Sequence, residues 1–453
     1  MASTTVTSLA HLVGHGSGPI PRTLALIAGT TALYASFDAL RLRWHEPRFD
    51  ARRSWRTLPA ALTRVVDHPM TRRTLQTWGA ALAFLTLAVL TNGYGGEDLG
   101  LGMVFVLFWV GLVPASLLLG PVWRLVNPLR SLHALLCAAL RVPPTEGLRP
   151  LPAHLGRRPA ALGLLAFGWL ELAAPGRDSA GTVLVWLWLY AAVQLICATV
   201  YGDRWFEHGD AFEVYSTLLA AMSPLGRAAG PDTAAGPAGD RPGKGGRPLV
   251  LRNPFDALAS VRPGPGLEVL VSVLLALTAF DGFANTGLWR SLAEGLPQSP
   301  VRTAGLLAAV AVMLGLLRLS GWAARRLSPG TGWSSAAMAP SLLPVAAGYV
   351  LAHYASVLVT EVQRFADVFL VTGEPAAVHH GGAAATAYAL PAALVVSLFQ
   401  VAFVVTGHVV AVVAAHDGAV GALPARRRVL PQVPLFAAML ALTLGALTLL
   451  LNA

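Results

Sequence analysis

The sequence predicts an all-α fold, a polytopic transmembrane helical bundle with about ten spans. The chain has 453 residues, of which 55% are hydrophobic and 12% are charged, and its mean hydropathy is +0.59. A soluble domain carries about 25% charged residues, so this chain has too few polar side chains to cover a water-soluble core. The apolar residues also come in blocks that are long enough to cross a bilayer.

Each expected span is an apolar block, separated from the next by an Arg-rich or a Gly- and Pro-rich stretch. A helix rises ~1.5 Å per residue, so about 20 residues cross the ~30 Å hydrocarbon layer. The expected spans are 20–40, 77–93, 99–120, 159–175, 180–201, 265–285, 301–320, 340–361, 385–416 and 432–452. The second block is short and the ninth is long, so the count ranges from about nine to about eleven.

The basic residues predict the orientation, because cytoplasmic loops retain Lys and Arg during insertion. Alternate loops hold 28 of the 33 basic residues, namely the loops 41–76, 121–158, 202–264, 318–339 and 417–431. The opposite side holds the other five, Arg22, Arg177, Arg290, Arg302 and Arg364. We therefore expect a multi-pass protein of the plasma membrane with Arg-rich cytoplasmic loops and both termini outside. Topology accounts for the net charge of +10 without a nucleic-acid partner.

The Arg-rich segments are expected to contain two or three interfacial amphipathic helices. The dipeptide Asn-Pro occurs at 127–128 and at 253–254, and each copy opens a run with apolar residues at helical spacing. Asn caps a helix well, and Pro suits the first helical position. Asp210 with Glu213 three residues later predicts a capping box for a further helix.

A Gly- and Pro-rich stretch predicts a division of the chain into two parts. Residues 226–248 contain eleven Gly or Pro residues, which is typical of a flexible linker, here a cytoplasmic one. The division gives an N-terminal transmembrane part, 1–225, and a C-terminal transmembrane part, 249–453, each with about five spans.

Polar residues at membrane depth are candidates for function, because ionisable groups are expensive to insert into hydrocarbon. Asp281, His353, His408 and Gln400 lie at overlapping depths in their expected spans, and Glu361 follows on the same helix as His353. These five residues are expected to bind a small solute or ion, or to relay protons. Two imidazoles and one carboxylate, His353, His408 and Asp281, also suit a divalent metal. The alternative is a structural role, in which each polar group bonds to a neighbouring helix.

Several short motifs match a known family. They are FWVGLVP (108–114), VWRLVNPLR (122–130), GDAFEVY (209–215), FDG (280–282), AHY (352–354), TGH (406–408) and AHD (415–417). In these motifs, which extend over most of 99–420, the chain resembles a family of actinobacterial multi-pass membrane proteins that often carries the label fenitrothion hydrolase. The resemblance implies hydrolysis of an organophosphate triester. It also implies a site that includes Asp281, His353, His408 and the pair at 416–417.

Three functions remain open at this point. The first is binding or transport of a small solute, ion or proton through the buried Asp and His residues. The second is an organophosphate or ester hydrolase embedded in the membrane, in which a metal activates water. The third is a non-catalytic accessory or assembly protein that acts through its cytoplasmic helices. The sequence contains no Walker loop, HExxH motif, dinucleotide fingerprint or GxSxG elbow, so the common soluble catalytic motifs do not choose among the three.

Overall fold

The computed structural model describes residues 20–53, 55–228, 247–372 and 390–452. Within these ranges, nine helical segments are long and apolar enough to cross a membrane. They are Arg22–Arg43, Pro69–Asn92, Asp98–Leu119, Ala180–Tyr201, Leu267–Ala284, Gln298–Leu327, Ser335–Phe369, Leu394–Ala422 and Leu430–Leu451. The predicted all-α, polytopic membrane fold is confirmed.

The fourth predicted span differs from the others. Helix α8 (Arg158–Leu172) has 15 residues and rises only ~22 Å, which is less than the ~30 Å hydrocarbon layer. Pro175 and Gly176, the latter with a φ of 65°, follow within a turn of its end and prevent continuation. The helix is buried between other helices through Leu164 and Phe167, so protein and not lipid surrounds most of it.

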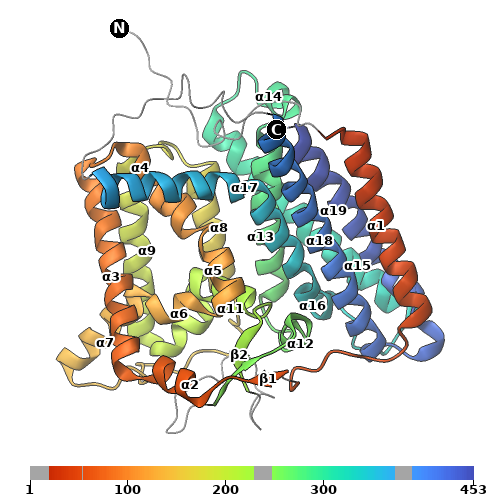
Figure 1. Cartoon of the computed structure of the whole chain (residues 1–453), viewed down its shortest axis with the longest axis horizontal. Coiled ribbons are helices and arrows are strands. Elements are labelled where there is room, and N and C mark those ends of the chain that lie inside the picture. The colour runs from red at the N-terminus through yellow and green to blue at the C-terminus, as the bar shows by residue number, and fades with distance from the viewer. Residues whose placement is uncertain (1–19, 54, 229–246, 373–389, 453) are drawn as a thin grey trace.

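The helices form two groups that lie side by side (Figure 1). The first group contains α3 (Pro69–Asn92), α4 (Glu97–Gly102), the π-helix η2 (Met103–Phe108), α5 (Leu112–Leu119), α6 (Val122–Val126), α8, α9 (Ala180–Tyr201), α10 (Phe206–Gly209) and α11 (Ala211–Ala220). The second group contains α1 (Arg22–Arg43), α13 (Leu267–Ala284), α15 (Gln298–Leu327), α16 (Ser335–Met338), α17 (Leu343–Ala366), α18 (Leu390–Ala422) and α19 (Val433–Asn452). The groups meet where α8 packs on α13 and where α17 packs on η2 and α5.

The N-terminal helix α1 packs against α18 and α19 and so belongs spatially with the second group. The linker predicted at 226–248 leaves strand β2 (Leu225–Arg227) and returns to strand β3 (Leu249–Leu251), while 229–246 lie outside the described residues. β3 pairs antiparallel with β2 on one side and with β1 (Arg56–Thr57) on the other. The small sheet therefore joins a segment that follows α1 to both ends of the linker.

Short helices gather at the two ends of the bundle. Figure 1 shows α2 (Ala60–Asp67), α7 (Pro128–Leu140), α12 (Pro254–Leu258) and the strands at one end, and α14 (Gly287–Leu292) at the other. The described parts of the Arg-rich segments thus share one end of the molecule, as predicted. Which side of the membrane that end faces stays a prediction.

The two Asn-Pro dipeptides cap helices as predicted. Asn127 Oδ1 accepts hydrogen bonds from the amides of Leu129 and Arg130 at the start of α7, and Asn253 Oδ1 accepts one from Phe255 at the start of α12. The second helix is only five residues long, much shorter than the expected run. Two prolines and a glycine at 263–265 follow it and favour an irregular turn.

Candidate functional site

The polar cluster around Asp281 brings two of the predicted site residues into contact. Asp281 lies one turn before the end of α13, and its Oδ2 is 3.1 Å from Nε2 of His353 on α17. The hydroxyl of Tyr354 donates a hydrogen bond to the same oxygen. The side chains of Asp281 and His353 are only 15% and 5% exposed. One carboxylate oxygen therefore binds both an imidazole and a phenol in surroundings that contain little solvent.

Two polar atoms next to this contact have no hydrogen-bond partner among the residues that the structure describes. They are Nδ1 of His353 and the hydroxyl of Tyr349, and both are fully buried. The ring of Tyr349 stacks on the imidazole, with centroids 5.8 Å apart and planes 13° apart. Gly282 permits this approach, because a Cβ there would lie 2.6 Å from the Tyr349 hydroxyl. Buried polar atoms without partners are uncommon and point to a place where a ligand or water is bound.

Further charges approach Asp281 from both helix groups. Asp281 interacts electrostatically with Glu171 at the end of α8, with Arg177 in the loop that follows, and with Arg302 on α15. Arg177 donates to the carbonyls of Glu171 and Leu172 at 3.3 Å each, and Arg302 donates to that of Leu172 at 3.3 Å. The cluster thus combines α8, α13, α15 and α17 where the two groups meet. Arg177 and Arg302 were not predicted as site residues, although both belong to the five arginines outside the Arg-rich loops.

His408 and Gln400 do not join the cluster. His408 lies on α18, is 1% exposed, and bonds through Nδ1 to the carbonyl of Val404 on its own helix at 2.8 Å. Its Nε2 has no hydrogen-bond partner in the described ranges, and Gln400, two turns earlier on α18, is half-buried. Over the described ranges, no three His, Cys, Asp or Glu side chains are grouped so that they could hold a metal ion. Asp281, His353 and His408 lie at similar depths on their helices, but they do not form the predicted set of metal ligands.

Glu361 occupies a separate site on α17. It lies eight residues beyond His353, or ~12 Å along the helix. Its side chain is buried, with Oε1 3.9 Å from Nη1 of Arg364 and Oε2 without a hydrogen-bond partner. That carboxylate lies against Gly102 at the junction of α4 with the π-helix η2, where a Cβ would be 2.3 Å from Oε2. Glu361 is therefore a buried acid at the contact between the helix groups, outside the Asp281 cluster.

The pair at 416–417, which the family resemblance placed in the site, has a structural role. His416 bonds to the side chain of Gln432 at 2.9 Å and to the carbonyl of Trp44 at 3.1 Å. Asp417 accepts hydrogen bonds from the indole of Trp44 at 3.0 Å and from the amide of Arg48 at 2.6 Å. These bonds hold the segment after α1 against the end of α18.

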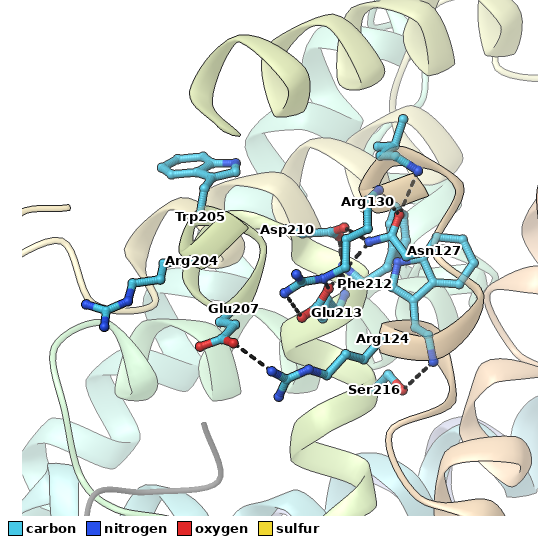
Figure 2. Close-up of polar contacts among 12 residues, drawn as sticks. Arg124, Asn127, Arg130, Arg204, Trp205, Glu207, Asp210, Phe212, Glu213 and Ser216 are labelled. Atoms are coloured by element: carbon cyan, nitrogen blue, oxygen red, sulfur yellow. Dashed lines mark hydrogen bonds and ion pairs between the residues drawn. The ribbon is translucent and has the colours of Figure 1, made fainter. Parts of the chain in front are cut away.

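The first helix group contains a second polar cluster, which Figure 2 shows in close-up. Asn127 Nδ2 donates to Asp210 at 2.7 Å, so the residue that caps α7 also binds the residue that caps α11. Asp210 accepts from the amides of Phe212 and Glu213 at 2.9 and 3.2 Å, and from the hydroxyl of Tyr190 at 2.9 Å. The predicted cap at Asp210 is confirmed.

The second half of the predicted capping box is wrong. Glu213 does not return to the backbone of Asp210, because Arg130 binds both of its carboxylate oxygens at 2.6 Å. Arg124 forms a second ion pair with Glu207 at 2.7 Å (Figure 2). Burial, and then the negative charge of Glu213, raise the pKa of Asp210 from 3.8 to about 6. This cluster ties α6, α7, α10 and α11 together.

These features define a multi-span helical membrane protein with buried Asp and His residues. Comparison of the chain with family models, with curated proteins and with solved structures found no match. The resemblance to the multi-pass family labelled fenitrothion hydrolase therefore stays a prediction that rests on short motifs alone.

Proposed function

We propose that this protein binds and transports a small anion together with a proton, at the cluster of Asp281, His353 and Tyr354. The observation that carries the proposal is the single Asp281 oxygen that both His353 Nε2 and the Tyr354 hydroxyl bind. An imidazole paired with a carboxylate can take up and release a proton, and such pairs within membranes mark proton relays.

The location of the cluster supports a transport role. Asp281 and His353 lie on α13 and α17, and α8 and η2 of the other helix group pack directly against these two helices. Transporters commonly bind their substrates between two bundles that move relative to each other. When the two helix groups move relative to each other, the contacts of such a polar site change, because its partners come from both groups.

The charges around the cluster favour an anion as the co-transported solute. Two guanidinium groups, Arg177 and Arg302, surround Asp281 together with one further acid, Glu171. Uptake of one proton at the Asp281–His353 pair adds one positive charge to this set. A small anion then binds more tightly, and by linkage the anion also favours the protonated state.

A pH jump on proteoliposomes adsorbed to a solid-supported membrane tests this proposal. Proton binding within the membrane should displace charge and give a transient current in the wild type, and Asp281→Asn should abolish the current. Asp38→Asn is the matched control, because Asp38 is an exposed carboxylate that pairs with Arg41 on the same helix. An Asp281→Asn protein that folds and gives the wild-type current would overturn the proposal and favour the accessory function.

Ester hydrolysis, which the family resemblance implies, stays a prediction that no contact among the described residues supports. Release of product from a fluorogenic phosphotriester by wild type, and its loss in His353→Gln, would give that alternative the support it now lacks.

A further inference from the structure

One end of α15 carries a cavity that the proposed transport site does not use. The helix has 30 residues and rises ~45 Å, so it extends beyond the ~30 Å hydrocarbon layer. The cavity has a volume of about 440 Å³, within the range of about 300–1,000 Å³ that is typical of small-ligand pockets. It is lined by Glu268, Arg318, Leu319, Trp322, Arg325 and Ser335.

Three of the lining residues form a stripe along α15. Arg318, Trp322 and Arg325 are spaced by four and then three residues, so they lie on one face of the helix. The stretch 303–317 that precedes them is uncharged. The 20 residues that follow Arg302, up to Trp322, rise ~30 Å, so Arg318 and Trp322 lie in the last turn of the hydrocarbon layer and Arg325 lies just outside it.

The cavity has an excess of positive charge. Its one acid, Glu268, lies 3.6 Å from Arg318 and accepts a hydrogen bond from Ser335 at 3.0 Å. In the part of the chain that the structure describes, no carboxylate pairs with Arg325. The guanidinium of Arg326 lies 5.3 Å above the ring of Trp322 and adds a further positive charge nearby.

The wall of the cavity that faces the membrane is apolar. Leu319 and Trp322 are 62% and 52% exposed, and at this depth their exposed surfaces meet lipid chains. A second cavity, of about 340 Å³, adjoins Leu327 at the end of the same helix and is lined by 425–431, which include three consecutive arginines. The whole end of α15 therefore lies in a positive electrostatic field beside exposed apolar surface.

We propose that this cavity binds the phosphate of one anionic phospholipid. Arg318 and Arg325 hold the phosphate oxygens, and the acyl chains run along Leu319 and Trp322. Guanidinium groups match phosphate in charge and hydrogen-bond geometry, and basic pockets at the membrane surface favour anionic headgroups. A zwitterionic lipid adds a cation to this positive site and binds more weakly.

Native mass spectrometry of the detergent-purified full chain tests the proposal with phosphatidylglycerol, phosphatidylcholine and soluble glycerol phosphate as probes. The wild type should retain phosphatidylglycerol in preference to phosphatidylcholine. The double variant Arg318→Gln/Arg325→Gln should bind phosphatidylglycerol about 30-fold more weakly. Arg72→Gln/Arg73→Gln, which removes two exposed arginines at the start of α3, should bind like the wild type.

A further variant keeps the proposal testable if the double variant does not fold. Glu268→Gln removes the acid from the cavity and should bind phosphatidylglycerol several-fold more tightly than the wild type. Equal binding in wild type and in either cavity variant would overturn the proposal, as would an equal loss in the Arg72→Gln/Arg73→Gln control. Binding of soluble glycerol phosphate as tight as that of the lipid would show that the site takes a soluble phosphate, and would also contradict the proposal.

Discussion

The two polar clusters of this protein differ in how completely their buried polar groups are hydrogen-bonded. In the first helix group, Arg130 binds both oxygens of Glu213, and Asn127 and Tyr190 satisfy Asp210. In the cluster of Asp281, a single carboxylate oxygen binds both His353 Nε2 and the Tyr354 hydroxyl. Among the described residues, Nδ1 of His353 and the hydroxyl of Tyr349 have no partner. A fully bonded network stabilises a fold, whereas an incompletely bonded one leaves positions for a ligand. This difference is the reason why we propose a functional role for the second cluster and a structural role for the first.

The largest stability effect is expected in the first cluster. Arg130→Met leaves the carboxylate of Glu213, which is 2% exposed, without its bidentate partner. Loss of one member of a buried ion pair costs about 3–5 kcal/mol, so the thermal unfolding midpoint in detergent should fall sharply. The double variant Arg130→Met/Glu213→Leu removes both charges and should recover part of the loss. A single variant that melts like the wild type would contradict the structural role of this cluster.

A smaller loss of stability is expected from Gly282→Ala. The added Cβ would lie 2.6 Å from the Tyr349 hydroxyl and 3.3 Å from Cβ of Leu449, and overpacking of this kind costs about 1–3 kcal/mol. Removal of the hydroxyl in Gly282→Ala/Tyr349→Phe should restore much of the loss. Thermal melting of the four proteins forms a double-mutant cycle. If the changes in stability of the two single variants simply add in the double variant, the added methyl group and the Tyr349 hydroxyl are not in contact.

The raised pKa of Asp210 predicts a pH dependence that is confined to the first cluster. The folded state keeps a proton on Asp210 up to about pH 6, while the unfolded state releases it near 3.8. The resulting stabilisation is complete below the unfolded pKa and is lost as the pH rises through the folded pKa, so about 1 kcal/mol should disappear between about pH 5 and pH 8. Asp210→Asn should remove this part of the dependence. An identical pH dependence of melting in wild type and Asp210→Asn would refute it.

The smallest stability effect is expected from Tyr349→Phe. The hydroxyl has no hydrogen-bond partner, so its removal should change the free energy of unfolding by less than about 0.5 kcal/mol. The same change should weaken binding of the anion if the hydroxyl faces it, which the amplitude of the pH-jump current reports. A loss of several kcal/mol would mean that the hydroxyl is already satisfied in the protein.

The sequence was sufficient for the features that depend on local chemistry. Apolar blocks predicted the spans, and Asn127, Asn253 and Asp210 predicted caps that the structure contains. The block predicted at 159–175 forms α8 but ends earlier, at Leu172, and Pro175 and Gly176 follow it directly.

The candidate site was predictable only in part. Asp281 and His353 were identified as polar residues within apolar blocks, but Tyr354 carried no signal that placed it beside Asp281. His408 was grouped with them by depth alone, which fixes neither the rotation of a helix nor its neighbours, and the hydrogen bond that the structure gives it is to Val404 on its own helix. One feature of the sequence could have indicated Arg177 and Arg302. They lie on the side with few arginines, where topology does not explain a positive charge and a local acidic partner is expected.

The central claim is that the Asp281–His353 pair holds an exchangeable proton. Nitrogen NMR of protein labelled with ¹⁵N-histidine tests it most directly, with the signal of His353 identified by its absence in His353→Gln. We predict that the Nε2 signal of His353 responds to a change of pH in the wild type and that Asp281→Asn alters this response, because the carboxylate that binds Nε2 is gone. A His353 signal that is the same at every pH, or that responds identically in Asp281→Asn, would contradict the claim.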